Sequence, residues 1–430
     1  MSSSDLLFST RDLLIGVATA ATQIEGGDRN NNWYDWAQLP GTIADGSTPL
    51  RATDHWQRWR EDTALMAELG LQVYRMSIEW SRIEPRPGEF DHASLARYRE
   101  EIAAIREAGI EPLVTLHHFS HPSWFEGLGA FTNPHSVERF LAFTRVVVQA
   151  LGDLVTDWVT INEPNVYATQ AYLYKETPPA RTDWLALRAT LRHMAIAHVG
   201  AYRLIHELQP DAMVGFAHHA REFAPLNHRN PLHRAVSRID RALFQDLLAD
   251  AMLAGDWTRL LGPRPAEVTP GRYYDYLGLN YYSRSAVKGL ADGTFPGADV
   301  NDLGWEIHPQ GLVSIAGDLH RRHPAPIWVT ENGTADARDA FRSRFIHEHL
   351  AAMATSGLPF ERFYHWCFVD NWEWAEGEVP RFGIVELDYQ SQERTVRDSG
   401  RFLAGIISDG GVTRAAYEEF VEGQTYRKMG

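Results

Sequence analysis

The amino-acid sequence predicts an α/β fold, a (β/α)8 TIM barrel formed by a single domain with long βα loops. Two observations predict it. Eight short apolar or β-branched runs recur along the chain, and stretches with helical periodicity separate them. Strand–helix alternation is typical of a parallel sheet, and eight such units close into a barrel, which can exceed about 400 residues when its loops are long.

The eight runs have the lengths and residue types of buried strands. In chain order they are residues 14–18, 73–78, 112–116, 158–161, 213–217, 276–279, 327–330 and 362–368. A doubly wound open sheet is the alternative to the barrel, and it usually carries a Gly-rich turn after its first strand. Residues 22–27, which follow the first run, are Thr-Gln-Ile-Glu-Gly-Gly and lack that fingerprint.

Helical patterns fill the intervals between these strands. Residues 54–69 place Trp56, Trp59 and Met66 near one face, and residues 95–105 do the same with Tyr98 and Ile102. Further helices are predicted over residues 136–150, 185–208, 235–253, 312–320 and 340–354. Residues 292–302 are predicted as a loop, and no Ser/Gly-rich or Pro-rich linker interrupts the chain, so we expect one domain over residues 1–430.

Composition excludes several classes of protein. The net charge of −15 argues against binding to a nucleic-acid backbone, which needs clustered Lys and Arg. No apolar run approaches the roughly 18 residues of a membrane span, and residues 1–12 lack the pattern of a secretory leader. The single cysteine rules out an internal disulfide, which allows a reducing compartment. We therefore expect a cytoplasmic protein with no nucleic-acid or membrane partner; the sequence carries no indication of its oligomeric state.

Polar and aromatic residues follow every predicted strand, at the end of a barrel where catalytic groups lie. Two carboxylates stand out among them, Glu163 after the fourth strand and Glu331 after the seventh. These strands lie on facing arcs of the barrel, so their ends point into one pocket. Two carboxylates across a pocket are what glycosidic bond cleavage requires: one protonates the leaving oxygen, and the other attacks the anomeric carbon or activates water. Alternatively, each Glu caps a loop or pairs with an Arg.

Six motifs follow the order of a known family. They are residues 23–26 (QIEG), 160–165 (TINEPN), 278–282 (GLNYY), 304–312 (GWEIHPQGL), 329–333 (VTENG) and 370–377 (DNWEWAEG). Through them the chain resembles glycoside hydrolase family 1, the β-glucosidase family, from about residue 12 to about residue 406. A single Asn-Glu-Pro would be weak support, whereas six motifs in order are specific.

The resemblance implies a hydrolase of carbohydrate metabolism, a retaining exo-β-glycosidase. Its substrate would be a small β-glycoside or oligosaccharide with a terminal non-reducing β-D-glucosyl residue, and β-galactosidase or β-fucosidase activity would be a side or competing activity. The resemblance implies that Glu331 is the nucleophile of a covalent glycosyl-enzyme intermediate, Glu163 the general acid/base and Arg75 the partner of the nucleophile. It implies substrate binding by Gln23, His118, Asn162, Asn280, Tyr282, Trp366, Glu373 and Trp374. No cofactor and no metal are implied.

Coulomb repulsion agrees with two different roles for the carboxyls. A retaining pair lies roughly 5–5.5 Å apart, where two like charges repel by about 3 kcal/mol, or about two pKa units. The two carboxyls do not both ionise easily near neutral pH, and a neighbouring Arg decides which ionises first. We therefore expect Glu331, next to Arg75, to be the ionised nucleophile and Glu163 the protonated acid. A buried structural ion pair is the alternative for Arg75.

Two positions depart from the family pattern. Position 119 is Phe where many members have Trp, so one indole N–H donor to the sugar is lost and the preference among epimers is open. Position 79 is Glu where many members have Ser, and we expect it to form a surface ion pair with Arg82. His117, next to His118, is expected to pack or to support the site from behind.

Other chemistries fit the sequence less well. A barrel metallohydrolase normally carries a His-x-His pair on its first strand, which is absent here, as is His-Glu-x-x-His. Relatives that take 6-phosphoglycosides carry Ser and Lys after the eighth strand, whereas Glu373 and Glu376 stand here and would repel phosphate. A catalytically inactive binding barrel would have lost one carboxylate, and both remain. The sequon at Asn332 abuts Glu331 and is expected to serve the pocket and not to carry a glycan.

Overall fold

Eight parallel strands form a closed barrel at the centre of the computed structural model, which describes residues 6–430. Each strand overlaps one of the eight predicted runs, so the predicted barrel is confirmed. Around the barrel they follow chain order, and the last pairs with the first. The strands are β2 (Leu14–Ala18), β3 (Val73–Ser77), β4 (Glu111–His117), β5 (Asp157–Asn162), β6 (Met213–His219), β8 (Leu277–Asn280), β12 (Ile327–Asn332) and β13 (Phe360–Trp366).

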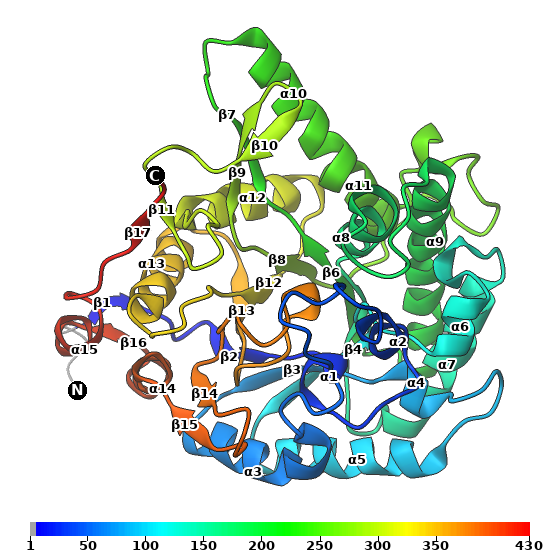
Figure 1. The fold of residues 1–430 in the computed structure, drawn as a ribbon, viewed down its shortest axis with the longest axis horizontal. Helices are drawn as coiled ribbons and strands as arrows, with labels where there is room; N and C mark the ends of the chain where they lie inside the picture. Colours follow the sequence, from blue (N-terminus) through cyan, green and yellow to red (C-terminus); the bar gives the residue numbers. More distant parts are fainter. Residues whose placement is uncertain (1–5) are drawn as a thin grey trace.

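Helices surround this barrel, as Figure 1 shows. The main ones are α3 (His55–Glu68), α5 (His92–Glu107), α7 (Ser136–Leu151), α9 (Trp184–Leu208), α11 (Leu247–Ala254), α12 (Pro309–Arg322), α13 (Arg342–Thr355) and α14 (Asp398–Asp409). All seven predicted helices are present. The one predicted over residues 235–253 is divided: α10 (Pro231–Arg241) joins α11 through a π-helical turn, η4 (Ala242–Asp246). Helix α14 was not predicted.

Short elements lie in the connections between the barrel strands and the main helices, before β2 and after α14. The short helices are α1 (Ala21–Ile24), α2 (Asn32–Ala37), α4 (Trp80–Ile83), α6 (Ser123–Gly127), η2 (Ala130–Thr132), α8 (Pro164–Thr169), η3 (Gln170–Tyr174), η5 (Arg259–Leu261), η6 (Trp374–Glu376) and α15 (Arg414–Phe420). Four small sheets pair β1 (Leu6–Ser9) with β16 (Gly411–Thr413), β11 (Asp299–Val300) with β17 (Arg427–Lys428), β14 (Val385–Leu387) with β15 (Arg394–Val396), and β9 (Arg284–Lys288) with both β7 (Glu222–Pro225) and β10 (Ala291–Gly293).

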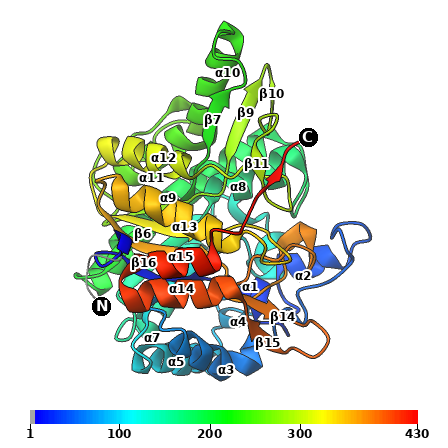
Figure 2. The ribbon, with the colours of Figure 1, turned by 90° about the vertical axis from the view of Figure 1, so that its left-hand side faces the viewer.

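Two connections, one between β6 and β8 and one between β8 and β12, together form a projection. Figures 1 and 2 both show β7, β9, β10 and α10 standing out from one edge of the barrel. The segment 292–302, predicted as a loop, contributes to β10 and β11 here, so that prediction is wrong in part.

Large side chains close the barrel at the amino ends of its strands. The rings of Tyr276 and Trp328 stack with centroids 3.8 Å apart, and the Arg362 guanidinium lies 3.9 Å from the Trp328 ring. Arg362 also pairs with Asp157 at the start of β5, with an N–O distance of 2.7 Å. Because these side chains fill the barrel at the amino ends of its strands, a pocket can form at the carboxyl ends.

Two expectations from the sequence concern the chain as a whole. The single-domain organisation over residues 1–430 stays a prediction. Residues 1–5 lie outside the described residues, and with them the beginning of the segment considered for a secretory leader. None of the helices within residues 6–430 is both long enough and apolar enough to cross a bilayer.

Candidate active site

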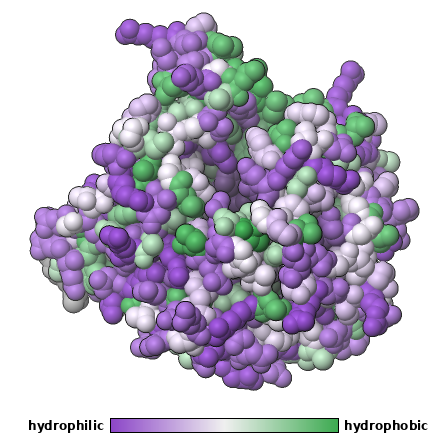
Figure 3. All heavy atoms as spheres, in the orientation of Figure 1, coloured by the Kyte–Doolittle hydropathy of each residue, from purple (hydrophilic) through white to green (hydrophobic). Residues whose placement is uncertain are grey.

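A pocket of about 170 Å³ lies at the carboxyl ends of the barrel strands. The face seen in Figure 3 is hollowed near its centre, next to the projecting loop. The predicted site residues that line the pocket are His118, Asn162, Glu163, Tyr282, Glu331, Trp366, Glu373 and Trp374. Gln23, Arg75 and Asn280 are fully buried and lie just behind this lining. The structure therefore brings the predicted set to one place, although its members come from seven barrel strands and the loops after them.

Glu163 follows β5 in an unusual backbone conformation. Its φ of 42° and ψ of 57° are left-handed, a state that costs a non-glycine residue about 1–3 kcal/mol and persists only where the surroundings enforce it. The N–H of Glu163 donates to Ala217 O on β6 at 2.8 Å, and Pro164 begins helix α8 directly after it. Asn280 Nδ2 donates to Glu163 Oε1 at 2.8 Å, and His219 Nδ1 lies 3.0 Å from the same oxygen.

Glu331 lies on β12, and both of its carboxylate oxygens accept hydrogen bonds. Arg75 Nη1 donates to Oε1 at 2.6 Å, and the Tyr282 hydroxyl donates to Oε2 at 2.8 Å. The Arg75 side chain has no exposed surface, so water does not screen this ion pair. Two residues further on, Gly333 lets the end of β12 lie against β13, because a Cβ there would come within 1.9 Å of Trp366 O.

A chain of hydrogen bonds joins the two glutamates. From Glu331 it passes to Arg75, whose Nη2 donates to Asn162 Oδ1 at 2.7 Å. Asn280 Nδ2 lies 3.0 Å from the same Asn162 oxygen and also donates to Glu163. The side chains from four different strands thus fix one another, which holds both carboxyls in a defined geometry.

The charges of the site shift the pKa values of both glutamates. Burial raises the pKa of Glu331 to about 7 against the pull of Arg75, and the facing Glu163 adds to the rise. Burial alone would also raise the pKa of Glu163, but His219 and the amide of Asn280 hold it below its usual value. That Arg75 makes Glu331 the first of the two to ionise stays a prediction, because burial and Glu163 oppose the ion pair at Glu331 and the two carboxyls titrate as a pair.

One wall of the pocket combines a buried carboxyl with flat aromatic rings. Trp366 Nε1 donates to Glu373 Oε1 at 2.9 Å. Burial raises the pKa of Glu373 to about 8 in spite of this bond, and Glu331 adds to the rise. The His118 ring lies nearly parallel to the rings of Trp366 and Trp374, with centroids 5.9 and 6.0 Å away. The wall therefore offers both a flat surface and hydrogen-bonding groups.

His118 and Gln23 each keep one buried polar atom without a partner among the described residues. Asn162 Nδ2 lies 3.0 Å from His118 Nε2, so Nε2 accepts and the ring proton stays on the unpartnered Nδ1. Burial holds the pKa of His118 well below its ordinary value, which keeps the ring neutral. Gln23 donates to Asn371 Oδ1 and Trp372 O, and its Oε1 is the unpartnered atom. Both atoms therefore remain able to form a hydrogen bond with a bound ligand.

The two departures from the family pattern have different outcomes. Phe119 lines the pocket, and its ring meets Trp374 nearly edge to face with centroids 5.4 Å apart. The predicted surface ion pair of Glu79 with Arg82 is wrong. Glu79 is only 3% exposed, and Arg82 Nε instead donates to Glu25 Oε2 at 2.6 Å. Because the chain turns into α4 directly after Glu79, this side chain is enclosed and not left at the surface.

Several pocket residues were not predicted. They are Val166, Gln170, His219, Arg221, Trp305 and Phe382. His219 carried a signal, since two histidines end the fifth strand; of these, His218 packs against Phe216 and His219 meets Glu163. Trp305 stands in one of the six motifs without an assigned role. Phe382 belongs to an irregular stretch after β13, where no periodicity marks an inward side chain.

Two further possibilities can be examined in the structure. Within residues 6–430, no three His, Cys, Asp or Glu side chains gather as ligands of a metal ion would. Asn332 of the sequon is fully buried and donates to Tyr281 O at 2.7 Å, and Thr334 is also fully buried. A glycan therefore has no access to Asn332 in the folded chain.

Comparison with known protein families gives a match that spans most of the chain. The model described as glycosyl hydrolase family 1 matches residues 8–412. β-Glucosidase A of Thermotoga maritima is 32% identical, over 93% of this chain and 97% of its own length. A 1,4-β-D-glucan glucohydrolase of Thermotoga neapolitana is 30% identical, over 93% of this chain and 98% of its own length.

Solved structures agree in fold. The β-glucosidase from Thermotoga maritima in complex with glucoimidazole superposes with a TM-score of 0.87 at 29% identity, and covers 94% of this chain and 100% of its own. The same enzyme in complex with galacto-hydroximolactam gives a TM-score of 0.88 at 28% identity, with 94% and 99% covered.

Proposed function

The chain belongs to glycosyl hydrolase family 1, and on that premise we propose that it is a retaining exo-β-glycosidase that removes terminal β-D-glucosyl residues from the non-reducing ends of small β-glycosides or oligosaccharides. Membership makes it a glycoside hydrolase of the β-glucosidase type. The observation that carries the finer proposal is the pair Glu163 and Glu331, which line one pocket and are joined by a chain of hydrogen bonds.

In the first step the Glu331 carboxylate attacks the anomeric carbon. The bond from that carbon to the glycosidic oxygen breaks, its electron pair leaves with the oxygen, and Glu163 protonates this oxygen. The donors Arg75 and Tyr282 hold both oxygens of Glu331 in position for the attack. The contacts to Glu163 converge on Oε1, so its Oε2 is the atom that presents the proton.

The two carboxyls need one proton between them. They share one proton at pH values between the lowered pKa of Glu163 and the pKa of about 7 of Glu331, whichever carboxyl holds it. In the free pocket, burial and the facing Glu163 hold the pKa of Glu331 high. Positive charge that develops at the anomeric carbon favours the Glu331 carboxylate, so the proton moves to Glu163 as the glycosidic bond breaks.

In the second step Glu163 acts as a base. It takes a proton from water, the water oxygen bonds to the anomeric carbon, and the ester bond to Glu331 breaks. Two displacements at the same carbon restore its starting configuration. All atoms and protons balance through the two carboxyls and water, so the proposed reaction needs no cofactor.

The pocket wall opposite the leaving group binds the terminal sugar. Glu373, Gln23 and the His118 Nδ1–H bind its hydroxyls, and Trp366 supplies the flat surface beneath it. The volume of about 170 Å³ is below the roughly 300 Å³ at which pockets for larger ligands begin, which suits a single terminal sugar. Residues 371–378, which include Glu373 and Glu376, contain no Lys or Arg that would bind the phosphate of a phosphorylated sugar.

Two observations support the proposed preference among sugar substrates. The related β-glucosidase forms complexes with glucoimidazole and with galacto-hydroximolactam. Phe119 offers no donor to a sugar hydroxyl, so it does not enforce one epimer. We therefore place β-glucosides first and include β-galactosides and β-fucosides as competing substrates. A cytoplasmic location is part of the same proposal, on the ground of the single, buried Cys367.

Two measurements test the function. The first is a panel of aryl β-glycosides that differ only in the sugar, for which we expect the highest kcat/KM with glucose and no turnover of 6-phosphoglucosides. The second is proton NMR of the sugar first released, which should be the β-anomer. An initial α-anomer would overturn the retaining mechanism, and absence of turnover across the panel would overturn the proposed function.

A further inference from the structure

Arg221 lines the pocket close to the group that protonates the leaving oxygen. It stands two residues after His219, whose ring contacts Glu163 at 3.0 Å. Among the described residues that line the pocket, it is the one Arg or Lys. The two-step reaction does not use Arg221, and the wall that binds the terminal sugar does not include it. Because Glu163 acts on the glycosidic oxygen, a group beside it faces the part of the substrate that leaves.

The projection beside the pocket holds the Arg221 side chain by packing (Figures 1 and 2). The guanidinium carbon lies 5.2 Å from the ring centroid of Phe244 in η4 and 6.0 Å from that of Phe223 in β7, within reach of a cation–π attraction. The backbone N–H of Arg221 donates to Oε1 of the buried Gln245 at 3.1 Å. Both the backbone and the side chain of Arg221 are thus fixed by elements of the projection.

The guanidinium keeps donors that no protein group fully uses. Its Nη1 lies 3.5 Å from Ser285 Oγ and 3.8 Å from Asp292 Oδ2, and both distances exceed the roughly 3.2 Å of an ordinary N–H···O bond. Its Nε is buried without a partner among the described residues. The side chain is 31% exposed, so a ligand in the pocket can reach it. A planar fork of N–H groups therefore remains able to bind acceptor atoms.

The surroundings of Arg221 favour a neutral ligand that carries hydroxyl groups. An anionic ligand would lie beside Asp292 and would enter a pocket that already holds three carboxyl groups, those of Glu163, Glu331 and Glu373. An alkyl group offers no acceptor to a guanidinium. A sugar hydroxyl accepts a hydrogen bond without adding charge, and neighbouring hydroxyls of one ring can meet two N–H groups of the same fork.

We propose that Arg221 is a specificity-determining residue for the leaving group: its guanidinium donates to hydroxyls of a second sugar ring and so favours β-linked disaccharides over β-glucosides whose leaving group lacks hydroxyls. The inference rests on the proposed function, which places the glycosidic bond next to Glu163. It also gives the projection a role, because β7 and η4 hold this binding group in place.

The direct test is the variant Arg221→Met, which keeps a long side chain and removes every donor. The substrates are cyclohexyl β-D-glucoside and three disaccharides, cellobiose, laminaribiose and sophorose. All four have a secondary alcohol as the leaving group, so each needs the proton of Glu163, and an indirect effect on Glu163 cancels in a ratio of rates. The ratio of kcat/KM for the best disaccharide to that for the cyclohexyl glucoside should fall about 10- to 100-fold, as for loss of a charged hydrogen bond.

The control is Arg238→Met, which removes an exposed Arg from helix α10 of the same projection, outside the pocket lining. It should keep the wild-type ratio. Arg221→Lys serves if Arg221→Met fails to fold, because it retains the charge and most of the length. Its single ammonium group cannot reproduce a planar fork, so the ratio should still fall, by at least about threefold. An unchanged ratio in either folded Arg221 variant would overturn the inference.

The outcomes also distinguish this inference from the function on which it rests. A wild-type protein that hydrolyses neither the disaccharides nor the cyclohexyl glucoside nor any aryl β-glycoside contradicts the proposed function. A wild-type protein that hydrolyses β-glucosides, but whose Arg221 variants lose the same proportion of kcat/KM on disaccharides and on the cyclohexyl glucoside, contradicts the role of Arg221 alone.

Discussion

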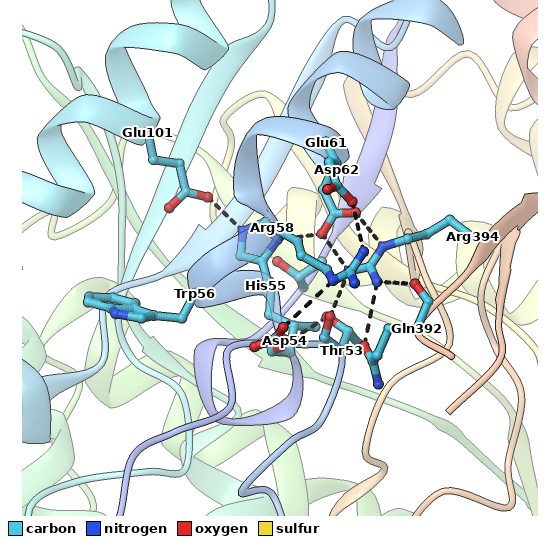
Figure 4. Close-up of polar contacts among 12 residues, drawn as sticks. Thr53, Asp54, His55, Trp56, Arg58, Glu61, Asp62, Glu101, Gln392 and Arg394 are labelled. Atoms are coloured by element: carbon cyan, nitrogen blue, oxygen red, sulfur yellow. Dashed lines mark hydrogen bonds and ion pairs between the residues drawn. The ribbon is translucent and has the colours of Figure 1, made fainter. Parts of the chain in front are cut away.

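The pocket and the buried network around His55 both hold several ionisable side chains, but their charges are balanced differently. In the network, which comprises His55, Asp62, Arg97, Glu101 and Arg394, each carboxylate has two cationic neighbours. Figure 4 shows His55 between Asp62 and Glu101, with Arg394 beside Asp62. His55 lies 2.7 Å from both Asp62 and Glu101, Arg394 pairs with Asp62 at 2.9 Å, and Arg97 pairs with Glu101 at 2.6 Å. In the pocket, Arg75 pairs with Glu331, whereas Glu163 contacts His219 and Glu373 accepts only from Trp366, so neither of these two pairs with an Arg or Lys within residues 6–430.

The balance of charge sets the direction of each pKa shift. Burial opposes charge in both places, but in the network the partners outweigh it: Glu101 and Asp62 raise the pKa of His55 to about 10, and the pKa values of Asp62 and Glu101 are lowered. In the pocket burial prevails at Glu331, with a pKa of about 7. A fully paired network keeps its charges fixed and ties α3 and α5 to β15, whereas an unbalanced cluster keeps a proton that can move.

The largest effect should come from removing the attacking carboxylate. Glu331→Gly should lower the turnover of an aryl β-glucoside on the order of 10⁵-fold, because no other group is placed to form the covalent intermediate. Added azide or formate should restore part of the activity by entering the vacated space. Failure of every external nucleophile would contradict the covalent role of Glu331.

The next effect concerns the proton donor and depends on the substrate. Glu163→Gln should reduce turnover of β-glucosides with poor leaving groups by about 10²–10⁴-fold, the usual contribution of general acid catalysis. Substrates such as dinitrophenyl β-glucoside should lose much less in their first step, because a good leaving group departs without a proton. Steady-state and burst kinetics across a series of phenols measure the difference. Equal losses for all leaving groups would show that Glu163 does not donate the proton.

The same contrast explains which residues could be predicted from the sequence. Glu163 and Glu331 lie at the ends of barrel strands within motifs that resemble those of the family, and strand ends of a barrel converge, so pattern and topology suffice to bring them together. The His55 network has no such signal: Arg394 and Asp62 are far apart in the chain and meet because β15 packs beside α3. The burial of Glu79 likewise has no signal in the sequence, since only the turn of the chain into α4 shows that this side chain is buried.

Protonation could not be predicted for a related reason. The motifs identified Arg75 as the partner of Glu331, and an ion pair alone would favour ionisation. The shift also depends on how deeply Glu331 is buried and on the contact of His219 with Glu163, neither of which is encoded in local sequence. The barrel, by contrast, follows from eight apolar runs whose alternation with helices leaves few other arrangements.

A smaller effect, on stability alone, should follow from unbalancing the His55 network. Asp62→Asn leaves His55 and Arg394 short of one negative charge, and breaking a buried ion pair costs about 3–5 kcal/mol. The free energy of unfolding should fall by about this amount, while kcat/KM of the folded protein stays near that of the wild type. The control is Glu61→Gln, an exposed neighbour paired only with Arg58, whose effect should be within about 0.5 kcal/mol. Loss of activity without loss of stability in Asp62→Asn would contradict the division between the two regions.

The smallest effect is an asymmetric dependence on pH. Above about 7 the catalytic pair loses its shared proton as Glu331 ionises, so kcat/KM should fall about tenfold per pH unit. His55 contributes its full stability below its unfolded pKa of about 6.5, and that contribution declines until the pH passes the folded pKa of about 10, so part of it remains at pH values where activity is already lost. Activity lost at about pH 8.5 should therefore return on dilution to about pH 6.5.

At acid pH, the stability contributed by the His55 network and the activity of the pocket should be lost in the same range. The lowered pKa values of Asp62 and Glu101 mean that their contribution to stability is present above the unfolded values of about 4 and is lost as the pH falls through the folded ones. Protonation of Glu163, whose pKa is also lowered, removes the second half of the catalytic pair in the same range. Acid inactivation should thus coincide with unfolding followed by circular dichroism, while alkaline inactivation should precede it. A reversible acid limb with an intact fold would show that the His55 network does not stabilise the protein through its charges.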